Sequence, residues 1–331
     1  MHRMKVLLLL AVLLIMIVPV YAQDDDFVSR QSLADENGTF VDVGSASIYY
    51  VTAGDPTKPP VILIHGFGGS TFTWRDTLPA LADAGFYAIA LDLPPFGLSD
   101  KNPELDYSRS SMAIWVAGLM DVLNIDTATI VGHSMGGGVA AQFAARYPER
   151  LDNLVFVAGG VFDAIRTVED ADDEQGDNGG SPLGLLNLIN PQSPVAEQLL
   201  RTLINEDYFR DTLRSAYYDD DLVTEEAVEG YARLIRIEDA PAGFLAYIQA
   251  DNSEAVDLST VVEAVRNTPV FIIWGEEDTW VPIALGELMF ERFSNAFMIT
   301  YAEVGHLPME EAPDAFNEAL INFLSPLEDA G

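Results

Sequence analysis

The sequence predicts an α/β fold with a mainly parallel sheet, and three observations lead to that prediction. Short apolar runs that suit buried strands recur along the chain, as at 61–64 and 87–91. These runs alternate with stretches of helical spacing, such as 112–123. Residues 128–147 combine a β-branched run, a glycine-rich turn and an Ala-rich helical stretch. Alternation of this kind is typical of parallel strands joined by right-handed crossovers.

Composition limits the class of protein and its partners. The chain has 331 residues, is 49% hydrophobic and carries a net charge of −35. Such a charge disfavours nucleic acid and anionic membrane surfaces as partners. Cysteine is absent, so the fold has no disulfides and must be held by its core. Acidic runs such as 24–26 fit solvated surface, and we expect no metal ion and no cofactor.

The first residues predict a targeting segment. Arg3 and Lys5 precede an apolar run at 6–20, and small residues follow near Ala22. This pattern is typical of a signal peptide at 1–22, so we expect a secreted or periplasmic protein. The run is short for a membrane span, which needs about 20 residues. An uncleaved N-terminal anchor is the alternative, and oligomeric state is not predicted.

The predicted core is divided into two parts, 23–160 and 268–331. Strands are expected at 40–43, 47–51, 61–64, 87–91, 129–131, 154–157, 270–274 and 297–301, and helices at 74–81, 112–123, 283–293 and 313–324. The first two strands should pair antiparallel around a turn. In the helix at 112–123, Ile114, Val116, Leu119 and Val122 are the expected inner face.

Between the two core parts the alternation stops. Residues 170–181 are acidic and glycine-rich, and helical stretches follow at 195–204, 207–217, 224–236 and 241–250. A helical block inserted between two sheet strands predicts a lid, which we place at 161–267. Tyr217 in this block is a candidate substrate contact, and packing within the lid is the alternative interpretation.

The turn within 128–147 supplies a candidate nucleophile. Gly132, Ser134 and Gly136 form a G-x-S-x-G pattern between a strand and a helix. The tight turn should strain the backbone at Ser134 and expose its hydroxyl above the sheet. Strand and helix crowd together two residues before and after the serine, where glycine fits. The positive end of the helix dipole should face Ser134.

A serine nucleophile needs a general base, and histidine suits neutral pH. After the predicted signal peptide only His65, His133 and His306 occur. We expect His133 to point into the sheet, away from the opening, and His65 to brace a loop through hydrogen bonds. His306, in a loop after the last strand, is therefore the candidate base.

The base needs a carboxylate to orient it. Glu276, Glu277 and Asp278 directly follow the strand at 270–274. From these residues alone all three compete, and Asp163 is a weaker alternative.

The oxyanion formed by attack on a carbonyl needs N–H donors. Met135, directly after the serine, should supply one backbone donor. Phe67, in the glycine-rich loop 65–70, is assigned the second, although a plain strand-to-helix turn is the alternative. The side chains of Phe67 and Trp74 are candidate substrate contacts.

Taken together, these motifs resemble the α/β-hydrolase superfamily, especially its lidded, esterase-like branch. The matching segments are His65–Gly69, Asp92–Asp100, Gly132–Gly137, Trp274–Pro282 and Gly305–His306, in the family's order. The resemblance implies a Ser134–His306–Asp278 triad and an eight-stranded sheet with a lid after the sixth strand. It favours Asp278 over the two glutamates. Pro95 stands where the family commonly has glycine.

The resemblance also implies a function. Dehalogenases and epoxide hydrolases of this fold use an aspartate at the position of Ser134, so the serine argues against both. We expect a secreted serine hydrolase that cleaves ester-type bonds of a small to medium substrate through an acyl-enzyme. The alternatives are a C–C bond hydrolase, a lactonase or amidase, or a perhydrolase on the same triad. A ligand-binding protein without turnover is the alternative from another class.

Overall fold

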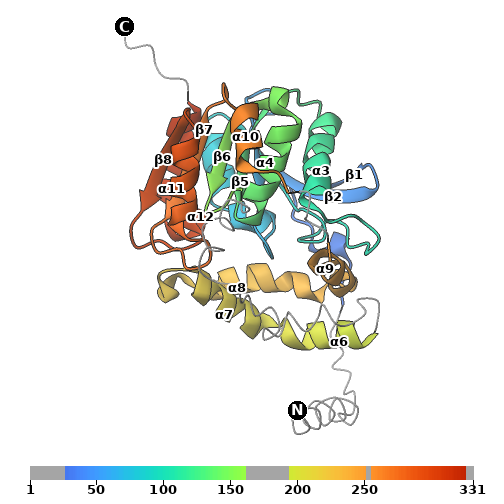
Figure 1. The fold of residues 1–331 in the computed structure, drawn as a ribbon. Helices are drawn as coiled ribbons and strands as arrows, with labels where there is room; N and C mark the ends of the chain where they lie inside the picture. Colours follow the sequence, from blue (N-terminus) through green and yellow to red (C-terminus); the bar gives the residue numbers. More distant parts are fainter. Residues whose placement is uncertain (1–26, 162–193, 251–254, 326–331) are drawn as a thin grey trace, which may run out of the picture.

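A computed structural model describes residues 27–161, 194–250 and 255–325 of the chain (Figure 1). The predicted signal peptide at 1–22, Asp163 and the acidic segment 170–181 lie outside these ranges. Within them, no helix is both long enough and apolar enough to cross a bilayer.

The core is one eight-stranded sheet. Its strands are β1 (Gly38–Val43), β2 (Ala46–Ala53), β3 (Pro60–Ile64), β4 (Tyr87–Leu91), β5 (Ala128–His133), β6 (Leu151–Val157), β7 (Val270–Gly275) and β8 (Ala296–Tyr301). The spatial order is β1-β2-β4-β3-β5-β6-β7-β8. Only β1–β2 and β2–β4 pair antiparallel, and the other neighbours are parallel. The predicted sheet is confirmed, including its antiparallel start.

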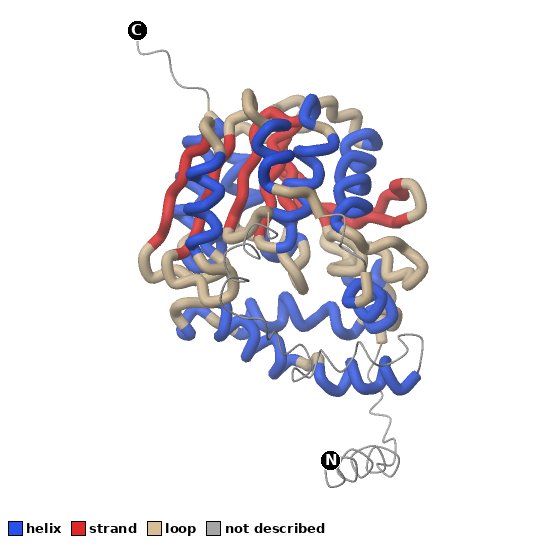
Figure 2. Tube along the Cα trace, viewed as in Figure 1, coloured by secondary structure: helices blue, strands red, loops and turns tan. Residues whose placement is uncertain are grey.

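Helices cover both faces of the sheet, which explains the continuous apolar runs (Figure 2). The core helices are α2 (Thr77–Asp83), α3 (Arg109–Val122), α4 (Met135–Arg146), α10 (Leu258–Ala264), α11 (Ile283–Arg292), α12 (Pro308–Glu311) and α13 (Pro313–Leu324). In β3, Ile62 and Ile64 pack in the cluster that holds residues of α3, α4 and α11. Val61 and Leu63 point the other way, into the cluster that holds residues of α2 and α13.

The predicted inner face of α3 was partly wrong. Val116 and Leu119 are buried, but Ile114 is 40% exposed and Val122 is 45% exposed. The buried stripe instead runs through Met112, Val116 and Leu119, at helical spacing. Ile114 and Val122 lie off this stripe because helix positions two or ten residues from Met112 fall on other faces.

The turn between β5 and α4 packs too closely for side chains. A Cβ atom at Gly136 would lie 2.5 Å from the carbonyl oxygen of His65 and 2.6 Å from that of Ile64. These atoms belong to the backbone and cannot rotate away. Glycine at this position therefore lets α4 approach the end of β3.

Gly136→Ala should therefore lower the free energy of unfolding by about 1–3 kcal/mol, the usual cost of overpacking a core. Denaturant unfolding measures this value. Gly138→Ala on the same helix is the matched control, because its Cβ would meet the flexible side chain of Arg109 at 3.1 Å. Equal stability of the two variants would contradict the close approach.

Among the described residues between β6 and β7, four helices precede α10. They are α6 (Pro194–Leu203), α7 (Glu206–Ala216), α8 (Glu225–Ala232) and α9 (Ala240–Ile248). Figure 1 shows them together on one side of the sheet, below the core helices. The predicted boundary at residue 267 is too late, because α10 packs on the core: Val261 and Val265 belong to the cluster around α4. The insertion therefore ends before Leu258.

A buried carboxylate joins the inserted helices to the core. Glu310 on α12 accepts hydrogen bonds from Arg75 Nη1 at 2.6 Å and from the Tyr217 hydroxyl at 2.8 Å. Its other oxygen accepts from the hydroxyl of Tyr231 on α8. The Glu310 side chain has no exposed surface, whereas 26% of the Arg75 side chain is exposed.

Glu310→Gln should lower the free energy of unfolding by about 2 kcal/mol, because a hydrogen bond to a charged group contributes about 1.5–3 kcal/mol. We place the value low in that range because Arg75 reaches solvent. Thermal or denaturant unfolding measures it. Arg75→Met and the double variant complete a mutant cycle, and strictly additive losses would show that Arg75 and Glu310 do not stabilise each other.

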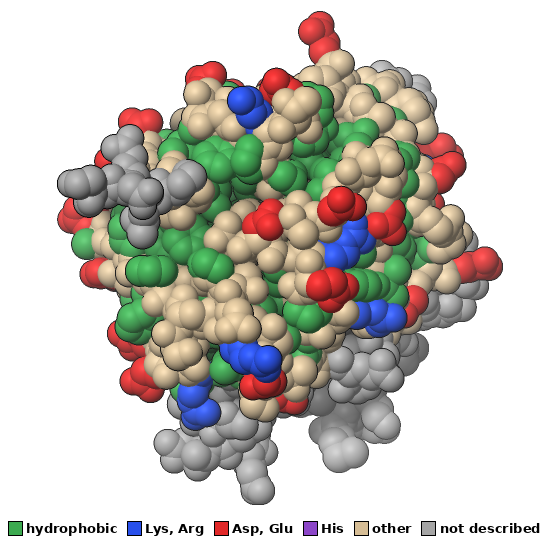
Figure 3. Space-filling view, turned by 90° about the horizontal axis from the view of Figure 1, so that it is seen from above, with side chains coloured by type: hydrophobic (Ala, Val, Ile, Leu, Met, Phe, Trp, Pro, Cys, Tyr) green, Lys and Arg blue, Asp and Glu red, His purple; other side chains and the backbone are tan. Residues whose placement is uncertain are grey.

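The predicted site does not lie on the face of the molecule that points away from the inserted helices. Figure 3 views the face away from the inserted helices, where acidic side chains are scattered and no histidine is visible. The side chains that carry the predicted chemistry lie between the sheet and the inserted helices.

Candidate active site

Ser134 occupies a strained turn between β5 and α4. Its backbone has φ 50° and ψ −121°, a conformation that costs a non-glycine residue about 1–3 kcal/mol. Two backbone bonds hold the turn: Ser134 N–H donates to the Val157 carbonyl at 2.9 Å, and Gly137 N–H donates to the Ser134 carbonyl at 2.8 Å. A Cβ at Gly159 would lie 2.3 Å from the Ser134 carbonyl oxygen. Two hydrogen bonds therefore hold the turn, and the backbone of Gly159 packs closely against it.

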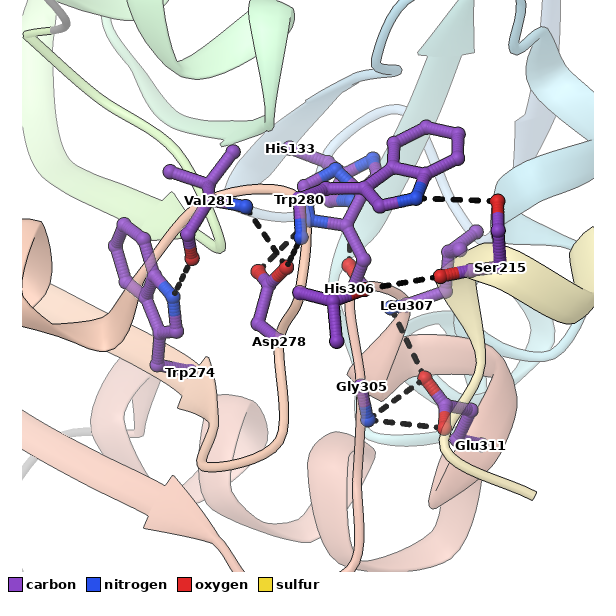
Figure 4. A network of polar contacts seen from close by, with 11 residues as sticks. His133, Ser215, Trp274, Asp278, Trp280, Val281, Gly305, His306, Leu307 and Glu311 are labelled. Carbon is purple, nitrogen blue, oxygen red and sulfur yellow. Dashed lines mark hydrogen bonds and ion pairs between the residues drawn. The ribbon is translucent and has the colours of Figure 1, made fainter. Parts of the chain in front are cut away.

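His306 and Asp278 form a buried pair (Figure 4). His306 Nδ1 donates to Asp278 Oδ2 at 2.8 Å, and the two side chains are 2% and 0% exposed. Asp278 Oδ1 accepts the backbone N–H groups of Trp280 and Val281, each at 2.9 Å. Because Asp278 holds the Nδ1 proton, Nε2 of His306 carries the free lone pair. Of the three carboxylates that follow β7, Asp278 is therefore the one that contacts His306.

The competing glutamates do not reach the imidazole. Glu276 and Glu277 are exposed, and Glu276 accepts a hydrogen bond from the Thr300 hydroxyl at 2.7 Å. Neither makes a contact with His306 in the described part of the chain.

Ser134 and His306 line one cavity of about 200 Å³. No hydrogen bond joins the Ser134 hydroxyl to the imidazole among the described groups. Hydrogen bonds of this kind are often long without substrate and tighten in the complex. The cavity brings the nucleophile and base candidates together.

The loop that carries His306 is held from the insertion and from α12. His306 N–H donates to the Ala216 carbonyl at 2.7 Å. The carboxylate of Glu311 accepts the backbone N–H groups of Gly305, Leu307 and Tyr218. Burial raises the pKa of Glu311, and the three N–H donors oppose that rise. Sequence analysis missed Glu311, although its place five residues after His306 was a possible signal.

His133 supports the same loop, and its predicted direction was wrong. Its Nε2–H donates to the His306 carbonyl at 2.9 Å, and the ring lines the cavity beside Ser134. Burial is the main cause that lowers the pKa of His133 well below its ordinary value. The neutral ring therefore has a single N–H group, which donates its hydrogen bond to the His306 carbonyl. That long-range acceptor draws the ring toward the cavity.

His65 braces its loop as predicted. Its Nδ1–H donates to the Gly66 carbonyl at 2.7 Å, and its Nε2 accepts from Leu93 N–H at 3.0 Å. Burial lowers the pKa of His65 to about 4, so the ring stays neutral at physiological pH.

The amides of Phe67 and Met135 remain candidates for the oxyanion site. Within the described ranges, neither N–H donates to another protein group. Met135 begins α4, so the helix dipole adds positive potential at its amide. The Phe67 side chain is 40% exposed and lines the cavity. Its assignment as a substrate contact stays a prediction.

Two predicted substrate contacts do not reach the cavity. Trp74 has no exposed surface and packs against Phe316 of α13, with ring centroids 6.4 Å apart. Tyr217 is 6% exposed, and its hydroxyl binds Glu310. Neither residue lines the cavity, because the Trp74 ring is packed within the core and the Tyr217 hydroxyl is bound to the carboxylate that joins the core to the insertion.

Other side chains take the lining positions. Four of them come from segments that the sequence suggested: Tyr208, Phe209 and Leu213 on α7, and Trp280 just after Asp278. The Trp280 ring lies 5.2 Å from the His306 ring, between centroids. Helical spacing in 207–217 was the signal for the first three. In the described residues, no group of three or more His, Asp or Glu side chains could hold a metal ion.

This fold and site define a class: hydrolases in which a serine at a strand-to-helix turn faces a histidine–carboxylate pair on an eight-stranded sheet. Residues 59–313 match the family described as alpha/beta hydrolase fold. The chain belongs to this alpha/beta hydrolase family.

Individual relatives give further comparisons. An uncharacterized hydrolase of Bacillus subtilis is 27% identical, over 85% of this chain and 96% of its own. A 2-hydroxy-6-oxononadienedioate/2-hydroxy-6-oxononatrienedioate hydrolase of Paraburkholderia phymatum is 28% identical, over 81% and 87%. The solved meta-cleavage product hydrolase of Pseudomonas fluorescens is 26% identical, covers 86% of this chain and 96% of its own, and has a TM-score of 0.67.

Proposed function

We propose that this hydrolase is a secreted enzyme that cleaves carboxylic esters through an acyl-enzyme on Ser134. The observation that carries the proposal is the buried His306–Asp278 pair, whose imidazole lines the same cavity as Ser134. In the proposed first step, Ser134 Oγ attacks the ester carbonyl while His306 Nε2 takes its proton. Asp278 stabilises the imidazolium that forms.

The amides of Phe67 and Met135 then bind the oxyanion of the tetrahedral intermediate. Collapse of this intermediate expels the alcohol, which receives the proton from His306. Water attacks the acyl-enzyme in the second half, with His306 again as base, and releases the acid. Each proton moves between His306 Nε2 and one oxygen atom: that of Ser134, of the leaving alcohol or of water. When the acid leaves, His306 returns the last proton to Ser134 Oγ.

The lining of the cavity favours an uncharged reacting group. Its described walls contain aromatic and aliphatic side chains with few polar groups, and no Lys or Arg. Apolar walls with a few placed polar groups are typical of small-molecule sites. Because an ester group is uncharged, it can bind in this apolar cavity without a counter-ion beside Ser134.

C–C bond hydrolysis is the second candidate. The relatives named as 2-hydroxy-6-oxononadienedioate and meta-cleavage product hydrolases favour it. The dioates in the name of the Paraburkholderia relative carry two carboxylates, and the described walls of the cavity at Ser134 place no Lys or Arg beside the reacting bond. We therefore rank ester cleavage first.

The test compares the two reactions on one preparation. A series of nitrophenyl esters with increasing acyl length and a 2-hydroxy-6-oxo-dienoate are assayed for kcat/KM. The proposal expects ester turnover that rises with acyl length until the cavity is filled. Faster cleavage of the dienoate than of every ester would establish the second candidate instead. N-terminal sequencing of exported protein, expected to begin near Gln23, tests secretion.

A further inference from the structure

A second cavity of about 110 Å³ adjoins the one at Ser134. Phe67, Gly68, Tyr208, Phe209 and Tyr231 border both. Beyond this shared border the second cavity is mainly apolar, with Leu200, Ile204, Leu234 and Phe244 among its walls. A chain leaving the catalytic cavity past Phe67 would meet apolar surface here.

Two cationic side chains, Lys101 and Arg201, also line the second cavity. All N–H groups of Lys101 Nζ are already used in hydrogen bonds to the protein. Lys101 Nζ donates to the carbonyls of Phe96, Gly97 and Ser99 at 3.2, 2.7 and 2.9 Å. An ammonium group has three N–H donors, so none remains for a ligand. Burial lowers the pKa of Lys101 below its ordinary value, and the nearby carboxylate of Asp92 opposes that change. Its visible role is to hold the loop after β4.

Arg201 on α6 is the other cation, and it is only partly committed. Its Nε and Nη2 donate to Glu197 at 3.2 and 2.9 Å, and Nη2 also donates to the Glu238 carbonyl. The Phe27 ring lies 4.2 Å from the guanidinium carbon. Nη1 is buried and has no hydrogen-bond partner. The side chain is 16% exposed.

A buried guanidinium nitrogen without a partner is unusual, because leaving such a donor unsatisfied costs free energy. Nη1 carries two N–H groups. A carboxylate would satisfy them with charge-assisted bonds, which are roughly twice as strong as neutral ones. An alkyl chain ending in a methyl group would fill the cavity but leave both donors unpaired.

We propose that the Arg201 guanidinium turns Nη1 into the second cavity and binds a carboxylate at the remote end of the substrate, so that the preferred substrate is an ester with an apolar chain that ends in an acid. This inference rests on the proposed function. It divides the substrate between two surroundings: an uncharged reacting end at Ser134 and an anionic end at Arg201. The net charge of −35 repels anions generally, so recognition of this end requires a local cation.

The test uses nitrophenyl monoesters of straight-chain dicarboxylic acids of increasing length and matched esters whose chains end in a methyl group. The readout is the ratio of kcat/KM, acid-ended over methyl-ended, at each length. The wild-type ratio should exceed one at the length that reaches Arg201. Arg201→Met should lower this ratio about tenfold or more, mainly through KM, as expected for a lost bond to a charged group. Arg201→Lys should retain part of it.

The matched control is Arg210→Met on α7. Arg210 pairs with Glu206 and Glu225 and lines neither cavity, so the ratio should persist. A wild-type ratio of one or less at every length, or an unchanged ratio in Arg201→Met, overturns the inference while ester turnover itself stands.

Calorimetry on Ser134→Ala separates the inference from the proposed function. The probe is the methyl half-ester of the same dicarboxylic acids, which binds without turnover. Binding that weakens about tenfold when Arg201→Met is added supports the inference even if no ester is hydrolysed. Equal binding with and without Arg201→Met, or no binding, overturns it.

Discussion

Ser134→Ala should lower kcat for ester hydrolysis by about 10⁶-fold, the loss seen when the nucleophile of such a triad is removed. In the proposed mechanism only Ser134 forms the acyl-enzyme, and its hydroxyl makes no hydrogen bond that supports the described fold. Alanine has the same Cβ as serine, so the strained backbone at φ 50° should persist. Steady-state kinetics measure the loss, and an unchanged unfolding midpoint shows that the fold is intact.

Ser110→Ala is the control for serine removal in general. Ser110 lies on α3, accepts a hydrogen bond from Arg146 at 3.5 Å and lines neither cavity. Its variant should retain wild-type kcat. Turnover by Ser134→Ala within tenfold of wild type would move the chemistry to another group.

Asp278→Asn should lower kcat by about 10⁴-fold with little change in KM. The backbone donors at Trp280 and Val281 would hold the amide oxygen where Oδ1 now lies. The amide NH₂ would then face His306 Nδ1 and donate to it. The imidazole would carry its proton on Nε2, which could no longer accept one from Ser134. Asp278→Asn should therefore preserve the fold and reverse the tautomer of His306.

Steady-state kinetics of Asp278→Asn and of two matched control variants check this expectation. Glu276→Gln and Glu277→Gln remove a carboxylate from the same segment but from exposed positions. Both should stay near wild type. A larger loss of kcat in either of them than in Asp278→Asn would show that Asp278 is not the carboxylate that orients His306.

The sheet could be predicted because its strands are covered on both faces. Ile62 and Ile64 face one helical layer and Val61 and Leu63 the other, so β3 is an unbroken apolar run in the sequence. The turn at Ser134 was recognisable for a similar reason. Its close packing requires glycine at fixed spacing, and that requirement is local.

Long-range packing could not be predicted in the same way. Trp74 follows a glycine-rich loop like a cavity residue, but Phe316, far along the chain, covers its ring. Tyr217 is similar: its hydroxyl is taken by Glu310, whose partner Arg75 lies in the first part of the core. Sequence gives the polarity of such side chains but not the neighbours that bury them.

The supports of the base were hidden for the same reason. His133 contacts the His306 carbonyl only because β5 ends beneath that loop. The Glu311 carboxylate accepts hydrogen bonds from backbone N–H groups of two segments, the His306 loop and the chain after α7 at Tyr218. The unpaired Nη1 of Arg201 likewise depends on which neighbours the fold places around the guanidinium, and the sequence does not give them.

Covalent labelling tests the central claim most directly. The purified protein is treated with a fluorophosphonate, and the labelled peptide is identified by mass spectrometry. We expect one adduct on Ser134, formed more slowly in Asp278→Asn and in His306→Ala and absent in Ser134→Ala. An adduct on another residue, or ester hydrolysis that continues in fully active form without any adduct, would contradict the account.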